Sequence, residues 1–470
     1  MTRVRVLLIA GSILPALLAA QAPTVPPRPT PGPAPSPRFP TLVLDTLPNG
    51  MRITVVEDHE LPLVTVRIGV TTGNFEEPAG KEGLFILMGQ ALREGTTTRT
   101  PAQIADAAAD LGVAITFDVP YTYPRFTAVR SSWEAALYIA ADEVMHPAFP
   151  AEAVARLKGG QLNSIARPQQ DTRASQLLYR TIFGDDNASG RMPTEASIQS
   201  LTREDVVGFH QRFVRPQNAY IVVAGDVTRR EAKAAVLRAF GSWERGGTTV
   251  AVLPRTVMPY TGATTVFLLH DPTSTATVAA GELLPDRASA AGTALEVIGP
   301  TIGTLQLAGR LYHAFREERG LSYAPSAAPN WRLSPQPGYW TFNIRTVPVA
   351  KADTAVTELV RLIRELNSTR PLTQEELDFG KRNRTGGLLR HTETTETLAA
   401  AAFDIMRLRM PGDFFATLPN RLNAVTLEEA RGVTAKMFDA AHMPIIVVGD
   451  TTVLGPSIRA TGIPVVVVSH

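Results

Sequence analysis

The chain contains no cysteine among its 470 residues. That absence excludes disulfide bonds, thiolate metal ligands, a cysteine nucleophile and a cysteine-linked lipid anchor. An excess of charge of one sign is also missing, since 46 Lys and Arg face 44 Asp and Glu. Electrostatics therefore gives no reason to expect nucleic acid as a partner. Stability must come from core size, and a chain of this length can bury a large core.

Local catalytic motifs are scarce as well. No two of the eight histidines lie at the short spacing that zinc-binding helices use. His313 and Glu317 are four residues apart, but no second histidine lies beside them. The chain has neither a Gly-x-Ser-x-Gly elbow nor a phosphate-binding loop. These absences argue against an independent peptidase whose metal ligands have moved elsewhere in the chain.

The N-terminus, in contrast, carries a clear pattern. Residues 1–22 begin with Arg3 and Arg5, continue as an apolar run and end in Ala-Gln-Ala, which is typical of a cleaved secretory signal peptide. The alternative is a retained membrane anchor, but the run is short and contains Pro15. Residues 23–40 hold nine prolines and predict an extended linker. We expect an exported, periplasmic protein with no stable membrane span after signal cleavage.

An internal repeat organises the remainder of the chain. Residues 201–226 and 425–450 align without a gap, and each predicts a capped helix followed by a buried strand that ends in Gly-Asp. Thr202 and Thr426 are the expected N-caps. Loop chemistry between the two copies suits a hinge. The predicted segments are a first half at 41–245, a hinge at 246–261 and a second half at 262–470.

A weaker match supports the same division. Val64–Gly69 resembles Ala276–Gly281, and both segments are strand-like. Strand-like runs alternate with stretches of helical apolar spacing, which predicts an α+β fold with helices that cover β-sheets. The expected helices are residues 101–111, 133–144, 350–366 and 373–389. The order of the strands does not follow from these patterns.

Several segments, taken in order, resemble the insulinase or pitrilysin type of metallopeptidase, which includes proteins like the mitochondrial processing peptidase. Residues 47–58 resemble the opening hairpin of that family, residues 72–84 the loop before its zinc helix, and residues 310–323 its second-half signature. Together the matches extend over residues 41–450. The resemblance implies two homologous halves, each with an antiparallel-rich sheet, that close on a hinge as a clam-like chamber.

The resemblance breaks at the metal site. Active members carry His-x-x-Glu-His, in which two histidines bind Zn²⁺ and the glutamate activates water, and a further glutamate downstream completes the ligands. Here Ile86 and Gln90 stand at the histidine positions and Gly89 at the general-base position. No glutamate lies within residues 153–194, where the last ligand belongs. We therefore predict a core-facing helix at residues 84–92 and no metal bound by this chain.

The second-half signature is intact. It implies an Arg and a Tyr, seven residues apart, against the substrate at the zinc, and Arg316 and Tyr323 have this spacing. The alternative is structural, with Arg316 paired to a glutamate on its own helix face and Tyr323 merely packed. The resemblance implies a non-zinc subunit that binds unfolded peptides and completes the active site of a zinc-bearing, homologous partner in a heterodimer. A non-catalytic peptide-binding or scaffold protein of the same fold remains the alternative.

Overall fold

The computed structural model describes residues 38–118, 122–184, 187–250, 260–305, 308–331 and 337–468. The predicted signal peptide lies outside these ranges, as do most of the predicted linker and the centre of the predicted hinge. Within the described ranges, no helix has both the length and the apolar character that crossing a bilayer requires.

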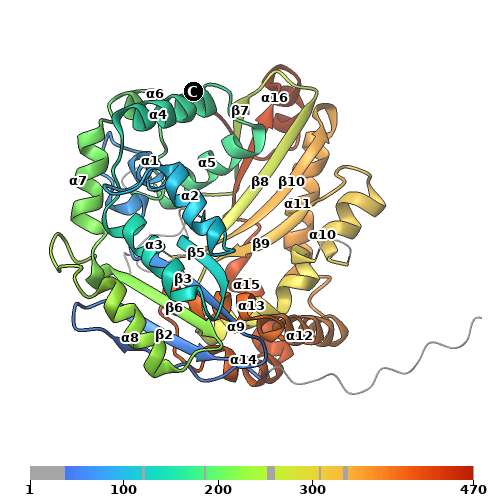
Figure 1. The fold of residues 1–470 in the computed structure, drawn as a ribbon. Coiled ribbons are helices and arrows are strands. Elements are labelled where there is room, and N and C mark those ends of the chain that lie inside the picture. The colour runs from blue at the N-terminus through green and yellow to red at the C-terminus, as the bar shows by residue number, and fades with distance from the viewer. Residues whose placement is uncertain are drawn as a thin grey trace, which may run out of the picture. The chain divides into compact units, whose positions relative to one another are not determined.

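Two six-stranded sheets form the framework (Figure 1). Five strands follow the same order in both sheets, and the sixth, an edge strand, differs: it is antiparallel to its neighbour in the first sheet and parallel in the second. The first sheet runs β1-β2-β6-β3-β5-β4 and the second β12-β7-β11-β8-β10-β9. Most neighbours are antiparallel; β2 with β6, β7 with β11 and β12 with β7 are parallel. The strands are β1 (Asp45–Thr46), β2 (Arg52–Glu57), β3 (Leu63–Val70), β4 (Thr116–Asp118), β5 (Thr122–Val129), β6 (Ala219–Gly225), β7 (Thr265–His270), β8 (Thr275–Leu283), β9 (Ser326–Asn330), β10 (Tyr339–Pro348), β11 (Pro444–Gly449) and β12 (Val465–Val468).

Helices pack on these sheets in both halves, so the α+β prediction is confirmed. All four helices expected from apolar spacing are present. The first half contains α1 (Leu84–Ala91), α2 (Pro101–Asp110), α3 (Trp133–Met145), α4 (Ala151–Ala166), α5 (Gln170–Phe183), α6 (Glu195–Gln199), α7 (Arg203–Phe213) and α8 (Arg229–Phe240). The second contains α9 (Ala290–Gly299), α10 (Arg310–Tyr312), α11 (Ala352–Leu366), α12 (Gln374–Leu388), α13 (Thr395–Leu408), α14 (Phe414–Ala424), α15 (Leu427–Met437) and α16 (Thr451–Arg459). Short turns are η1 (Asn74–Glu76), η2 (Pro216–Asn218), η3 (Pro300–Thr304), η4 (His313–Glu318), η5 (Val349–Lys351) and η6 (Leu389–Thr392).

The internal repeat is confirmed at the level of single caps. The Thr202 side chain accepts the N–H of Asp205, and the Thr426 side chain accepts the N–H of Glu429. Each cap starts a helix, α7 or α15, that leads to a fully buried strand, β6 or β11. These strands pair with β3 and β8, which contain the two segments of the weaker match. Equivalent sequence positions therefore occupy equivalent places in the two sheets.

One helix of each half packs on the sheet of the other half (Figure 1). The sequence analysis did not predict this arrangement. Helix α13 of the second half packs on β3 and β6, where Glu396 pairs with Arg125 at 2.8 Å. Helix α5 of the first half packs on β8 and β11. There Arg173 pairs with Asp271 at 2.9 Å, and both side chains are less than 15% exposed. Burying the apolar side of each exchanged helix contributes about 1.5–3 kcal/mol for each large side chain.

Candidate functional site

Helix α1 is positioned by its own N-terminal loop. Gly83 is the N-cap residue and has a φ of +100°, a conformation that glycine adopts without strain. The Glu77 carboxylate accepts the N–H groups of Gly83 and Phe85 at 3.1 and 2.7 Å, which satisfies the open end of the helix. Burial raises the pKa of Glu77 to about 8. Leu84, Leu87 and their neighbours face the core, so the core-facing helix is confirmed.

The two positions at which the resemblance implies zinc-binding histidines hold an aliphatic side chain, Ile86, and an amide, Gln90. Ile86 is half-buried against the first-half core, and Gly89 is buried. Gln90 faces α4, where the Nε2 of Gln161 donates to the Oε1 of Gln90 at 3.4 Å. The same Nε2 lies 3.5 Å from the carbonyl oxygen of Gly83. This amide pair is neutral and internally hydrogen-bonded, so the donor set does not fit Zn²⁺.

Gln161, which contacts Gln90, is a residue that the sequence analysis did not name. We searched residues 153–194 for a glutamate, and an amide does not satisfy that search. Val154, Leu157 and Gln161 follow the i, i+3, i+7 spacing of one helix face, and the first two contact the first-half core. A polar residue that continues an apolar face is the signal that could have located it. Within the described ranges, no three or more His, Cys, Asp or Glu side chains cluster as metal ligands.

The second-half signature folds back on itself. It begins with one α-helical turn, α10, and continues as a π-helical turn, η4. Gly320 has a φ of +57°, and the N–H groups of Leu321 and Ser322 both donate to the carbonyl oxygen of Phe315. This reversal returns Tyr323 to the side of η4 on which Arg316 lies.

Arg316 and Tyr323 are in direct contact. The Cζ of Arg316 lies 3.9 Å from the ring centroid of Tyr323 and 5.2 Å from that of Tyr312. The Nη1 of Arg316 donates to the carbonyl oxygen of Tyr323 at 3.2 Å. Tyr323 is 75% exposed although it is a large aromatic residue. The pair thus presents a fixed guanidinium and an accessible phenol at the surface, which can donate hydrogen bonds to carbonyl or oxyanion groups.

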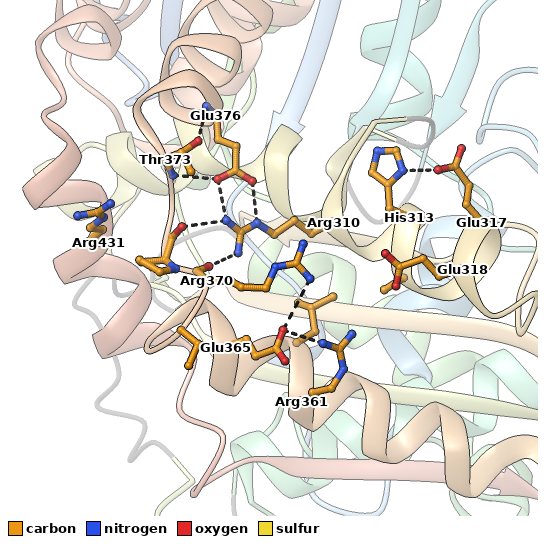
Figure 2. Close-up of a pocket in the computed structure, with 14 residues that line it drawn as sticks. Arg310, His313, Glu317, Glu318, Arg361, Glu365, Arg370, Thr373, Glu376 and Arg431 are labelled. Atoms are coloured by element: carbon orange, nitrogen blue, oxygen red, sulfur yellow. Dashed lines mark hydrogen bonds and ion pairs between the residues drawn. The ribbon is translucent and has the colours of Figure 1, made fainter.

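Ion pairs anchor the signature on both sides of Arg316. Arg310 binds Glu376 through Nε and Nη2, each at 2.7 Å. Arg319 binds Glu358 at 2.7 Å, and that carboxylate is only 1% exposed. A cavity of about 640 Å³ beside η4 is lined by Arg310, His313 and Glu317, among others. In Figure 2 Arg310 is turned toward Glu376, and His313 and Glu317 are turned toward each other. Arg316 does not line this cavity, so its side chain is directed elsewhere than that of Arg310.

Residues 200–384 match the family model described as the peptidase M16 inactive domain. Over this segment the chain is similar to the M16 peptidase family. It is 28% identical over 292 residues to an uncharacterized zinc protease of Mycobacterium leprae, a match that covers 60% of this chain and 64% of that protein. It is 26% identical over 208 residues to an uncharacterized zinc protease of Rickettsia bellii, covering 43% and 50%. The chain thus spans about half to two thirds of the length of these relatives.

Solved M16 structures share the fold. An M16 inactive domain from Pseudomonas fluorescens superposes with a TM-score of 0.78 at 20% identity, covering 87% of this chain and 98% of that one. The first half of the periplasmic protease PqqL from Escherichia coli gives 0.67 at 15% identity, covering 90% and 94%. The expected insulinase-type recognition is therefore confirmed. The chain thus combines an M16-like fold with the Ile86 and Gln90 side chains at the positions where the resemblance implies zinc-binding histidines.

Proposed function

We propose that this chain is the non-zinc subunit of an exported, periplasmic M16 heterodimer that cleaves unfolded peptides. A homologous partner supplies the zinc helix, the metal and the activated water. Arg316 and Tyr323 complete that active site in trans: the guanidinium binds a substrate carbonyl, and the phenol donates to the oxyanion that forms on attack.

One observation carries the proposal: an exposed Arg316–Tyr323 pair on an anchored segment, in a chain whose own metal positions hold amides. A scaffold gains little stability from a phenol that is 75% exposed. Donors aimed in advance at a developing charge, in contrast, are what a transition state requires. The Arg310–Glu376 and Arg319–Glu358 pairs supply that rigidity.

The test is reconstitution with a zinc-bearing M16 protein encoded beside this chain. Turnover of a quenched fluorescent peptide is measured for each chain alone and for the complex. Neither chain alone should reach the turnover of the complex. Arg316→Ala and Tyr323→Phe should each lower turnover by roughly ten- to a thousandfold, as expected for losing a transition-state donor.

Tyr138→Phe is the matched control, because Tyr138 is also an exposed tyrosine but lies on α3 of the first half. It should leave turnover unchanged, and size-exclusion chromatography should show that all variants still assemble. Full activity of the partner alone would refute completion in trans. Unchanged turnover in both Arg316 and Tyr323 variants would instead favour the non-catalytic peptide-binding or scaffold protein.

A further inference from the structure

A second cavity, of about 540 Å³, lies among α9, α14 and α15 (helices labelled in Figure 1). It belongs to other elements than the segment that carries Arg316 and Tyr323. Its walls are short and apolar, formed by side chains such as Ala291, Ala294, Ala424 and Val433. Its volume falls within the range of small-ligand sites, and an aliphatic or aromatic side chain of a ligand would fit against such walls.

Arg421 brings a cation to this apolar cavity. Its guanidinium lies over the Phe414 ring, 4.4 Å from the centroid, and Nη2 donates to the Phe414 carbonyl oxygen at 3.0 Å. Nη1 has only long contacts, at 3.4 Å, with the Ala288 carbonyl oxygen and the Thr293 hydroxyl. In the described part of the chain, no carboxylate forms an ion pair with Arg421, and its Nε is buried without a hydrogen-bond partner.

The charges around Arg421 include two carboxylates, Glu296 and Asp413, and neither forms an ion pair with Arg421 in the described part of the chain. The nearby Glu296 carboxylate is already bound by Arg287, at 2.7 Å, and by Arg384, so it does not neutralise a third arginine. Lys436 adds a further positive charge to the cavity lining. A half-buried guanidinium whose hydrogen-bond acceptors are all neutral is costly, and a ligand carboxylate bound directly to it would offset that cost.

One acceptor completes the lining. The Oε2 of Glu429 caps α15 by accepting from Thr426, which leaves Oε1 available to a donor. A ligand that combines a carboxylate, a neighbouring N–H group and an apolar side chain matches these groups together. The C-terminal residue of a peptide has all three, whereas a free fatty acid has no N–H group to offer.

We propose that this cavity binds the C-terminal residue of a peptide, with its carboxylate on Arg421 and its apolar side chain between the alanine and valine walls. The site is distinct from the proposed trans active site and requires no partner subunit. It would hold one end of a peptide, and its specificity would be for a free carboxylate next to an apolar side chain.

The experiment is fluorescence anisotropy on the whole chain without a partner. The probe is fluorescein-labelled Ser-Gly-Gly-Leu with a free C-terminus, compared with the same peptide as its C-terminal amide. The free acid should bind, and the amide should bind at least about tenfold more weakly, because the charged hydrogen bonds to Arg421 are lost. Equal affinity of acid and amide, or no binding of the acid, would overturn the proposal.

Gly432→Leu tests the location. Gly432 lines the cavity, and a Cβ there would meet no atom within 4 Å, so the larger side chain fills the space instead of straining the helix. It should weaken binding of the acid at least about tenfold. Ala435→Leu, on the same helix but exposed and outside the cavity lining, is the matched control and should change nothing. Unchanged affinity with Gly432→Leu, or octanoate binding as tightly as the peptide, would refute a site for peptide ends.

Because this assay contains no zinc-bearing subunit and measures no cleavage, its outcome is separate from that of the proposed function. A chain that fails to restore cleavage can still bind the free acid, and a chain that restores cleavage can fail to discriminate acid from amide.

Discussion

At the scale of single residues, Glu143 is an ionisable side chain that is buried in the protein. It lies on α3, is 4% exposed, and has one carboxylate oxygen without a hydrogen-bond partner. Burial, followed by the charge of Asp142, raises the pKa of Glu143 to about 8. A folded-state pKa above the unfolded value favours the neutral form. The stability that the neutral carboxyl group contributes is fully present below its unfolded-state pKa of about 4.5. It is lost as the pH rises through the folded-state pKa of about 8.

Glu143→Gln should therefore stabilise the protein at pH 9 by about 1–3 kcal/mol and have little effect at pH 5, because the amide removes the need to ionise a buried group. Urea unfolding of both proteins at the two pH values measures the difference. Glu134→Gln, at an exposed position on the same helix, is the control and should have little effect on the free energy of unfolding at either pH 5 or pH 9. Equal stability of Glu143→Gln and the unsubstituted chain at pH 9 would contradict the burial argument.

The family resemblance could name Arg316 and Tyr323 but not their contact. The contact depends on the reversal at Gly320 and on η4, and neither has a hydrophobic period that a sequence pattern could reveal. Gln161 was missed for a different reason. Gln161 lies beside Gln90 only because α1 packs against α4, and a local sequence pattern does not reveal which helices pack together.

At the scale of elements, α1 carries the positions at which the resemblance implies zinc ligands, and it packs against α4. Their facing positions bring Gln90 and Gln161 within hydrogen-bond distance, and Ile86 lies one turn before Gln90. The combination of Ile86→His, Gln90→His and Gln161→Glu should therefore bind about one equivalent of Zn²⁺ through two imidazoles and a carboxylate. Elemental analysis of the purified variant measures the metal.

The control variant carries only the two histidine substitutions, Ile86→His and Gln90→His. With Gln161 retained, the two histidines should hold zinc more weakly, so that dialysis against a mild chelator removes it sooner. If the triple variant, correctly folded by circular dichroism, binds no zinc, then α1 and α4 have diverged in orientation as well as in side chains.

Elements with their own local signals were the predictable part of the fold. Thr202 and Thr426 begin their helices as expected, because a side-chain cap acts within a few residues. The sequence could not predict on which sheet α5 and α13 pack. An amphipathic face indicates that one side of a helix is buried, but it does not identify the sheet that buries it. The division into halves at 41–245 and 262–470 stays a prediction. Helices α5 and α13 each pack on the sheet of the half to which they do not belong in sequence.

At the scale of the whole molecule, each sheet depends on a helix from the other half. The halves 41–245 and 262–470, expressed separately, should therefore be unfolded or aggregated, since each would expose the sheet face that α13 or α5 covers. Circular dichroism and sedimentation measure this outcome. The two halves expressed together should recover a soluble, folded pair.

A sharper control keeps both halves in one chain. Arg173→Leu breaks the buried pair with Asp271 and should cost about 3–5 kcal/mol, whereas Arg238→Leu breaks an exposed pair with Glu134 and should cost under about 1 kcal/mol. Soluble, cooperatively folding separate halves would show that the exchanged helices are dispensable.

The exchange also sets an order of events during synthesis. Strand β6, at the centre of the first sheet, ends at Gly225, but its covering helix α13 ends only at Leu408. The contacts that finish the first sheet thus join residues far apart in sequence, and such contacts form slowly because a long loop must close first. A ribosome must therefore release most of the chain before either sheet can be fully covered. The nascent chain would stay incompletely folded for nearly the whole of translation, with its native state reached in a late, cooperative step.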